Sequence, residues 1–372
     1  MSSTFKSFVL DQLSRAGVNA GTASPPADIA IHDDQVFSRL LREGTVGLGE
    51  TYMDGLWDAE PLDQLLYKVI AAGVQDHLPH DLSLIFSMLR GRLVNMQRLR
   101  AREVGEKHYD IGNDLYTAML DQRMIYSCGY WEHADTLDAA QEAKLDLICR
   151  KIGLEPGMKV LDIGSGWGGF LKFAAERYGI SGLGVTVSKE QAALANERNR
   201  GLPVETRLLD YMALEGQFDR IVSVGMFEHV GYKNYRSYFQ KAAQLLKPDG
   251  LFLLHCIGGH ISTSHGDPWT EKYIFANGML PSVSQIGKAV EGLFVMEDWH
   301  NFGAYYDRTL MAWLANFDAA WPQLSHRYDE RFRRMWRYYL SSSAALFRAR
   351  RISLWQIVLS PHGVEGGYHR VS

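Results

Sequence analysis

The sequence has 372 residues, more than one ordinary hydrophobic core needs, so one large and one small domain are predicted. Hydrophobic residues make up 46% of the chain and charged residues 22%, which is typical of a folded globular protein. The formal net charge of −4 gives no bulk attraction to nucleic acid, so no nucleic-acid partner is expected.

The three cysteines form no CxxC pair and have no zinc-ligand spacing. The sequence therefore predicts neither disulfides nor a metal site, which suits a reducing compartment. The first twenty residues lack the long apolar stretch of an export signal, and the chain has no run of about 18 apolar residues that could span a bilayer. A cytoplasmic location is expected.

Residues 1–100 contain short helical patterns interrupted by glycine and proline. In the first of them, Phe5, Phe8, Val9 and Leu13 recur at helical spacing. We predict a small, mainly helical N-terminal domain over 1–100, which includes a linker helix, and a larger domain over 101–372.

Residues 81–102 combine an apolar stripe with an arginine-rich face. The apolar positions are Leu82, Ile85, Phe86, Leu89, Leu93, Met96 and Leu99, and the basic ones are Arg90, Arg92, Arg98, Arg100 and Arg102. A basic amphipathic helix can lie on an anionic membrane surface. A domain-linking helix with a solvated face would show the same pattern, so the residues alone leave both interpretations open.

Strand and helix patterns alternate from Lys159 onward. Strands are predicted over 159–164, 181–187, 203–209, 218–224 and 250–258, with helices over 169–179, 188–199 and 234–246. This alternation predicts an α/β domain with a doubly wound parallel sheet and helices on both faces. Later strand patterns at 293–300 and 352–360, separated by two long helical stretches, would complete seven strands.

The first predicted strand runs into the glycine loop GSGWGG at 164–169. Glycines let the backbone turn sharply and approach a ligand beside a helix N-terminus. A dinucleotide would require an acid at the end of the next strand, but that strand ends VTVS at 185–188. With Asp162 two residues before the first glycine, the loop is similar to motif I of S-adenosylmethionine-dependent methyltransferases. A tight turn without a ligand and a dinucleotide site are the less favoured alternatives.

Asp210 and Tyr211 follow the third predicted strand. An aspartate there can accept a hydrogen bond from an adenine amino group, and a neighbouring aromatic ring can cover the base. Asp210 alone would equally suit a simple turn.

Two charged or titratable residues stand at the carboxyl ends of the fourth and fifth strands, Glu228 and His255. Burying such groups without partners is costly. Because ligands sit at the carboxyl edge of an open α/β sheet, we expect both residues to face a pocket. A buried pair that serves stability only is the alternative. His229 is interpreted as structural, because neighbours at a helix start point in different directions.

Several longer motifs match one family. They are LREGTVGLGETYMDG (41–55), EKHYDIGNDLY (106–116), YSCGYW (126–131), LDIGSGWGG (161–169), VTVSKEQ (185–191), FDRIVSVGMFEHVG (218–231), DPWTEKYIFANG (267–278) and MEDWHNFGAYYDRTLMAW (296–313). On these motifs the chain resembles the bacterial cyclopropane-fatty-acyl-phospholipid synthases over nearly its whole length. The resemblance implies a Rossmann-like, seven-stranded methyltransferase sheet. It also implies transfer of the methyl group of S-adenosylmethionine to a cis double bond of a phospholipid acyl chain, with closure of a cyclopropane ring.

The resemblance further implies that a bound bicarbonate ion deprotonates the carbocation formed on the acyl chain. Its donors would be the backbone at Cys128 and Ile257 and the side chains of His255 and Tyr306. Glu228 is expected to hold His255 and to accept a proton from the bicarbonate hydroxyl.

The same resemblance implies a set of residues around S-adenosylmethionine. They are Tyr109, Tyr126, Ser127, Gly164, Gly166, Thr186, Gln191, Asp210 and Tyr211. Tyr109 and Tyr126 could offer aromatic faces to the sulfonium cation.

Two positions depart from the family. Ser165 stands in the glycine loop where many relatives have cysteine, a small change that should be tolerated. Ser343 stands where some relatives carry a cysteine once proposed as catalytic. An unactivated serine does not replace a thiolate, which argues against a covalent role for that position.

An acyl chain inside a bilayer requires the enzyme to dock on the membrane. In the family context we expect residues 81–102 and the N-terminal domain to bind the phospholipid surface at the inner face of the cytoplasmic membrane. A homodimer is expected, since two weak contacts bind better than one. The alternatives are a C- or N-methyltransferase without ring closure and a non-catalytic lipid-binding protein. Retention of Cys128, Glu228, His255, Ile257 and Tyr306 favours ring closure.

Overall fold

The structure is a computed structural model that describes residues 2–21, 28–74 and 112–371. The predicted stripe at 81–102, the predicted domain boundary at residue 100 and Tyr109 lie outside the described residues. Contacts divide the chain into two compact units. The helical unit comprises Met1–Val94, His265–Ala276 and Leu310–Arg351, and the sheet unit comprises Asn95–Ser264, Asn277–Thr309 and Ile352–Ser372.

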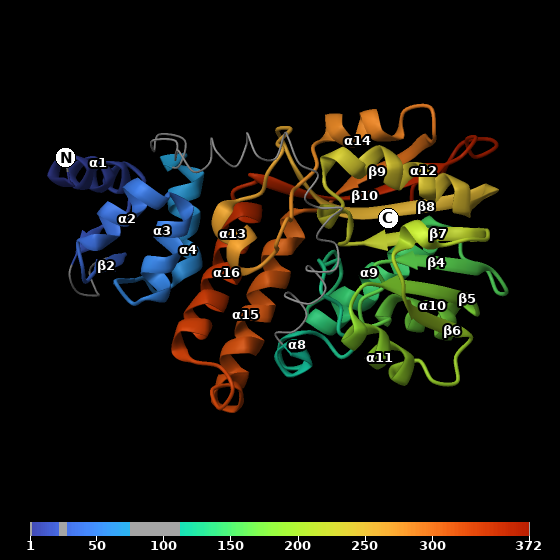
Figure 1. Cartoon of the computed structure of the whole chain (residues 1–372), viewed down its shortest axis with the longest axis horizontal. Helices are drawn as coiled ribbons and strands as arrows, with labels where there is room; N and C mark the ends of the chain where they lie inside the picture. Colours follow the sequence, from blue (N-terminus) through green and yellow to red (C-terminus); the bar gives the residue numbers. More distant parts are fainter. Residues whose placement is uncertain (1, 22–27, 75–111, 372) are drawn as a thin grey trace. The chain divides into compact units, whose positions relative to one another are not determined.

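The sheet unit is built on seven strands in the order β6-β5-β4-β7-β8-β10-β9 (Figure 1). They are β4 (Lys159–Ile163), β5 (Ser181–Thr186), β6 (Val204–Leu208), β7 (Phe218–Val224), β8 (Leu246–Gly259), β9 (Val295–Asn301) and β10 (Ile352–Ser360). Neighbours among β4 to β8 are parallel, whereas β10 is antiparallel to both β8 and β9. The predicted α/β fold with a seven-stranded sheet is confirmed.

Helices cover both faces of this sheet (Figure 1). The helices of the sheet unit are α8 (Asn113–Met119), α9 (Leu137–Lys151), α10 (Gly169–Tyr178), α11 (Lys189–Arg198), α12 (Tyr235–Leu245), α14 (Val283–Val290) and the first turn of α15 (Ala304–Leu324), with short 3₁₀ turns η2 (Tyr211–Ala213), η3 (Phe227–His229) and η4 (Tyr232–Asn234). Side chains alternate along β8: Phe252 and Leu254 join the core under α12 and α14, while Leu251 and Leu253 join the core under α9 and α10.

The path of the chain through the sheet creates a switch point. From β4 the chain moves outward to β5 and β6, and it then returns to β7 on the other side of β4. Ligands of open α/β sheets bind at the carboxyl ends of the strands at such a point. The glycine loop follows β4 and Glu228 follows β7, so both come to this edge.

The helical unit combines the N-terminal segment with later parts of the chain. Its elements are α1 (Ser2–Arg15), α2 (Gln35–Glu43), α3 (Thr45–Met53), α4 (Leu62–Ala71), α13 (Pro268–Tyr273), the later part of α15, α16 (Glu330–Arg348) and a small sheet of β1 (Ala20–Gly21), β2 (Ile29–Ile31) and β3 (Trp57–Asp58). The helix predicted around Val9 and Leu13 is confirmed as α1, which buries both residues.

Arginines of α16 hold this unit together. Arg334 Nη2 lies 2.6 Å from Asp58 Oδ1, and Arg348 Nη1 lies 2.8 Å from Asp63 Oδ2. These pairs explain why a late helix packs on α3 and α4, which stand near the start of the chain. Across the described part of the chain, no helix has both the length and the apolar character that crossing a membrane requires.

Candidate active site

The glycine loop adopts backbone angles that favour glycine. Gly164 and Gly166 have φ values of 86° and 52°. A Cβ atom on Gly164 would lie 2.6 Å from Met226 Cβ, so the loop is packed tightly against the turn after β7. A Cβ atom on Gly166 would meet nothing within 4 Å, which leaves that side of the loop open to a ligand.

Thr186 and Gln191 meet directly at the end of β5. Thr186 Oγ1 donates to Gln191 Oε1 at 2.8 Å, and both side chains are buried. Ser188 caps α11 by accepting from the Gln191 backbone N–H. The Gly164 N–H donates to the Val185 carbonyl at 3.0 Å, so this corner and the glycine loop are joined by backbone bonding.

Asp210 and Tyr211 lie beside the same corner. The backbone N–H of Leu209 donates to the Thr186 carbonyl at 3.0 Å, which fixes the chain just before Asp210. Asp210 Oδ1 accepts from the Met212 N–H at 2.9 Å, as in the turn that the sequence left as an alternative. The Asp210 side chain is nevertheless exposed and accessible to a ligand. The Tyr211 ring packs edge-on against Tyr238.

Tyr126 and Ser127 belong to a segment that is hydrogen-bonded to buried polar side chains of α9. The Tyr126 ring packs edge-on against Tyr116, with 5.2 Å between ring centroids. Ser127 Oγ accepts from Lys144 Nζ at 2.9 Å, and the Ser127 carbonyl accepts from Gln141 Nε2 at 2.8 Å. Gln141 and Lys144 are three residues apart on α9, and both are fully buried.

Two titratable side chains of the sheet unit are buried, Lys144 of α9 and Asp162 of β4. Burial lowers the pKa of Lys144 to about 8, against the opposing effects of Asp121, Cys128 and Asp162. Burial raises the pKa of Asp162 to about 7, although the charge of Lys144 opposes this shift. Within the described residues, Asp162 Oδ1 has no hydrogen-bond partner.

Glu228 lies in η3 and is almost fully buried. Its Oε1 accepts from the Ile257 backbone N–H at 2.6 Å. Burial raises the pKa of Glu228 to about 7, and the hydrogen bond from Ile257 only partly offsets this. Glu228 Oε2 is buried without a hydrogen-bond partner in the described part of the chain. The structure therefore differs from the expectation for Ile257, because its N–H donates to Glu228 and not outward.

His255 lies within β8 rather than at its end, since the strand continues to Gly259. It is level with Val224, the last residue of β7, and so still reaches the carboxyl edge of the parallel strands. Gln356 Nε2 on β10 lies 3.3 Å from His255 Nδ1. Among the described residues Glu228 and His255 share no hydrogen bond, so Gln356, and not Glu228 as expected, holds the His255 ring.

The surroundings of His255 define its protonation. Burial and the charges of Lys144 and Lys151 lower the pKa of His255 well below its ordinary value, so the ring is neutral. With the Gln356 amide oriented so that its nitrogen faces the ring, Nδ1 accepts and the ring proton is assigned to Nε2. His255 Nε2 is buried, and no described group serves as its hydrogen-bond partner. The ring therefore presents an unused N–H donor.

Cys128 and Tyr306 are both buried. Burial raises the pKa of the Cys128 thiol, which keeps it protonated. Tyr306 lies in the first turn of α15, and its backbone N–H donates to the Gly303 carbonyl at 3.0 Å. One turn further along, Thr309 Oγ1 accepts from the Gly129 N–H at 3.1 Å. The start of α15 thus contacts the residue that follows Cys128.

The contacts bring most of the predicted site residues to one edge of the sheet. A Cβ atom on Gly225, just after β7, would lie 3.9 Å from Ser127 Cβ, and the Gly225 N–H donates to the His255 carbonyl at 2.9 Å. The turn after β7 therefore touches the glycine loop, the Ser127 segment and β8 together. His229 is half-buried, and burial lowers its pKa to about 4. Ser343 lies on α16 in the helical unit.

Four buried polar residues of this region were missed by the sequence interpretation: Gln141, Lys144, Thr309 and Gln356. A local signal existed for two of the positions. Gln356 interrupts the apolar run ISLWQIVLS, and Lys144 shares the buried face of α9 with Leu145 and Ile148. A polar residue at an apolar position of the pattern indicates a buried partner or a site.

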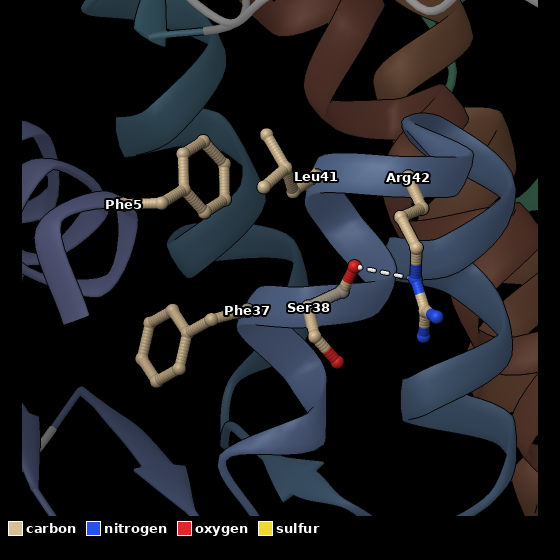
Figure 2. A pocket seen from close by; sticks show the side chains of 5 residues that line it. All are labelled: Phe5, Phe37, Ser38, Leu41 and Arg42. Atoms are coloured by element: carbon tan, nitrogen blue, oxygen red, sulfur yellow. Dashed lines mark hydrogen bonds between the residues drawn. The ribbon is translucent and has the colours of Figure 1, made fainter. Parts of the chain in front are cut away.

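A separate pocket of about 240 Å³ lies between α1 and α2 in the helical unit (Figure 2). It is lined by Phe5, Phe37, Ser38, Leu41 and Arg42. Arg42 Nε donates to the Ser38 carbonyl at 3.2 Å, and Lys6 Nζ lies 5.4 Å from the centroid of the Phe37 ring. The pocket therefore has mainly apolar walls with Arg42 at its border, while Lys6 Nζ is paired with Asp34 Oδ2 at 2.6 Å.

Comparison with known proteins identifies the family. The family model described as mycolic acid cyclopropane synthetase matches residues 96–357. The chain is 54% identical to the cyclopropane-fatty-acyl-phospholipid synthase of Escherichia coli over 95% of this chain and 93% of that protein. It is 36% identical to the tuberculostearic acid methyltransferase UfaA1 of Mycobacterium tuberculosis over 93% of this chain and 86% of that protein.

A solved structure agrees with this assignment. The mycolic acid cyclopropane synthase CmaA1, complexed with SAH and CTAB, matches with a TM-score of 0.64 and 32% identity, over 69% of this chain and 97% of that one. The chain therefore belongs to the mycolic acid cyclopropane synthetase family of methyltransferases, as its motifs predicted.

Proposed function

We propose that this enzyme transfers the methyl group of S-adenosylmethionine to a cis double bond of a phospholipid-bound acyl chain and closes a cyclopropane ring. The proposal is carried by one observation, the buried group of Glu228 and His255 at the switch point, which offers an acceptor and a donor without described protein partners. The identity to the Escherichia coli enzyme supports this choice of reaction.

The glycine loop fits S-adenosylmethionine, which supplies an electrophilic methyl group when bound. Gly166 leaves room for close approach, and Thr186 and Gln191 form a rigid corner beside it. The exposed carboxylate of Asp210 would accept from a polar group of the nucleoside, and Tyr211 and Tyr126 would offer ring faces. Ser127 and Gly164 would shape the wall between these groups.

An alkene is a weak nucleophile and carries no proton to remove before it reacts. The site must therefore position the chain, stabilise positive charge and exclude water. The exposed fractions of Cys128, Glu228 and His255 are 0%, 8% and 0%, which meets the last requirement. A bicarbonate ion, when bound, supplies a base for the final deprotonation.

The buried polar groups fit such an anion. Neutral His255 would donate from Nε2, and the Cys128 amide and Tyr306 hydroxyl would donate beside it. Glu228 Oε2 would accept the proton of the bicarbonate hydroxyl, which raises the basicity of the remaining oxygens. Because the Ile257 N–H already donates to Glu228 Oε1, we propose that Ile257 acts chiefly by orienting this carboxylate.

Access to the substrate would come from the helical unit. Its pocket combines apolar walls with Arg42, which suits an anionic phospholipid surface, whereas the charge of Lys6 is paired with Asp34. We propose peripheral binding to the inner face of the cytoplasmic membrane, helped by the arginine-rich stripe at 81–102 and by a homodimer. Binding to anionic vesicles should then weaken as salt rises, and salt-insensitive binding would contradict the role of the arginines.

A methyltransferase that does not close a ring is the second candidate, supported by the 36% identity to UfaA1. One assay separates the two. The protein is incubated with labelled S-adenosylmethionine, bicarbonate and vesicles of unsaturated phospholipid, and the released acyl chains are analysed by mass spectrometry and NMR. Ring closure adds one CH₂ group with loss of the alkene and gives cyclopropyl proton signals.

The other outcomes of this assay are equally clear. A methyl or methylene branch without cyclopropyl signals would favour the second candidate. Binding to the vesicles without cofactor binding by calorimetry and without labelled lipid would indicate a non-catalytic lipid-binding protein and would overturn the proposed reaction.

A further inference from the structure

The segment around Cys128 is anchored on one side by α9. Gln141 Nε2 donates to the Ser127 carbonyl at 2.8 Å and lies 3.4 Å from the Ile125 carbonyl. The Tyr130 N–H donates to the Ala140 carbonyl at 2.8 Å. Gln141 is fully buried, so its contacts are not exchanged with bulk water.

The Gln141 contact orients the Cys128 amide. The Ser127 carbonyl and the Cys128 N–H belong to one planar trans peptide, so they point in opposite directions. With the Ser127 oxygen fixed toward α9, the Cys128 N–H must point away from α9. No described acceptor takes this N–H.

The next peptide is anchored by α15. Thr309 Oγ1 accepts from the Gly129 N–H at 3.1 Å and from Trp131 Nε1 at 2.8 Å, and it lies 3.2 Å from the Tyr305 carbonyl, to which it donates. Thr309 Oγ1 also lies 3.9 Å from Cys128 Sγ, so its single proton faces two acceptors, while both of its acceptor sites are used. Thr309 is fully buried.

The two anchors therefore fix the peptide planes on both sides of Cys128. We propose that Gln141 and Thr309 are positioning residues that aim the Cys128 N–H at the anion of the active site. This inference rests on the proposed function. Tyr306 stands one turn before Thr309 on α15, so one helix end sets the direction of two of the anion's proposed donors. Neither Gln141 nor Thr309 touches the reacting groups.

The test uses the full-length enzyme with Thr309→Val, Thr309→Ser and Gln141→Leu. Thr309→Val keeps the side-chain shape and removes the hydroxyl, whereas Thr309→Ser keeps the hydroxyl. Ser223→Ala is the matched control, because it removes a buried hydrogen bond of the same unit, from Ser223 Oγ to the Ile163 carbonyl at 3.1 Å. The measurements are the bicarbonate concentration that gives half-maximal rate, the Kd for S-adenosylmethionine, and hydrogen exchange in the peptide that covers 126–131.

We expect Thr309→Val and Gln141→Leu to raise the half-saturating bicarbonate concentration by about tenfold. Loss of the residues that orient metal ligands has an effect of this size at metal sites. Exchange over 126–131 should accelerate in both. The Kd for S-adenosylmethionine should stay within about threefold for Thr309→Val, since a loss confined to the anion leaves cofactor binding intact. Thr309→Ser should restore the bicarbonate response, and Ser223→Ala should not change it.

Three results would overturn the inference. Unchanged exchange in both variants would show that the anchors do not fix the segment. Faster exchange with an unchanged bicarbonate response would show that the fixed segment does not serve the anion. A wild-type enzyme whose rate does not respond to bicarbonate would refute the proposed base itself. A wild type and a Thr309→Val variant that respond equally to bicarbonate would refute only the positioning role.

Discussion

Carboxylates named above in the two compact units differ in their partners. In the helical unit, arginines of α16 pair with carboxylates, and the hydrogen bonds that Asp58 accepts from Arg334 and His32 outweigh burial and lower its pKa. In the sheet unit, Glu228 and Asp162 form no such ion pair with any residue that the structure describes, and burial raises the pKa of each to about 7. Paired charges stabilise a fold, whereas unpaired buried titratable groups beside a loop indicate chemistry.

The largest effect on turnover is expected from replacing Glu228 with glutamine. We expect turnover to fall by about 100-fold, because a general-base-type proton acceptor is lost. The Kd for S-adenosylmethionine, measured by calorimetry, should be largely unchanged. An unchanged turnover would refute the role proposed for Glu228.

The pH dependence of the rate tests the raised pKa of Glu228. Below pH 7 the Glu228 carboxyl holds its own proton and cannot accept another, so with saturating bicarbonate the wild-type rate should rise through a midpoint of about 7. This limb should disappear in Glu228→Gln. A limb that persists in the variant would belong to another group, and Asp162 titrates near the same pH.

The free energy of unfolding should fall as pH rises, whereas the rate should rise. A carboxyl whose pKa is raised on folding is ionised first in the unfolded state, so the wild type loses stability as pH rises from about 4.5 to about 7. Relative to wild type, Glu228→Gln should therefore gain stability between pH 5 and pH 8, by an amount on the order of 2 kcal/mol. Thermal unfolding at both pH values measures the difference, and a pH-independent difference would contradict it.

In the helical unit the large effect should be on stability. Arg334 donates to Asp58 and to the carbonyls of Tyr52 and Trp57, and its side chain is only 19% exposed. Arg334→Ala should lower the free energy of unfolding by about 2 kcal/mol, since a buried charge-assisted network is lost. The control Arg15→Ala removes a pair with Asp11 whose arginine is 71% exposed, and it should cost about 0.3 kcal/mol. Equal losses in urea unfolding would contradict the difference.

A smaller effect is expected at the pocket between α1 and α2. Leu41→Glu places a negative charge in the pocket wall, where Leu41 is 38% exposed. Binding to vesicles that contain an anionic lipid should weaken by about fivefold, through lost apolar burial and charge repulsion. Gln35→Glu adds the same charge at the exposed start of α2 and serves as the control in a sedimentation assay. Equal weakening by both variants would assign the effect to net charge alone.

The smallest effect is expected at Ser165. Its Oγ is buried and finds no hydrogen-bond partner within the described residues, so Ser165→Ala should change the free energy of unfolding by no more than about 0.5 kcal/mol. Ser223→Ala, which removes a satisfied buried hydroxyl, should cost about 1 kcal/mol. A reversed order would show that Ser165 has a partner that the protein contacts do not reveal.

Local sequence patterns predicted the strands of the sheet unit and its glycine loop. The strands of the sheet unit follow from apolar runs bounded by glycine and polar residues, and the glycine loop follows from its spacing. The motif resemblance named Thr186 and Gln191 separately, and the structure brings the two side chains into hydrogen-bond contact.

Pairings between distant segments were not accessible in this way. The contact of His255 with Gln356 requires β10 to lie antiparallel to β8 in one register, and no local pattern sets that register. The same holds for the Ile257 N–H, whose acceptor comes from the turn after β7, and for α16, whose arginines find carboxylates near the start of the chain. These contacts depend on tertiary packing, which periodicity does not encode.

The position of β10 has a consequence for biosynthesis. It is the last strand of the sheet in chain order, yet it lies between β8 and β9. On a translating ribosome, β9 emerges before the strand that joins it to the rest of the sheet, and His255 emerges before Gln356. A nascent chain that stops short of Ile352 would therefore leave β8 without its β10 neighbour and His255 without its Gln356 contact.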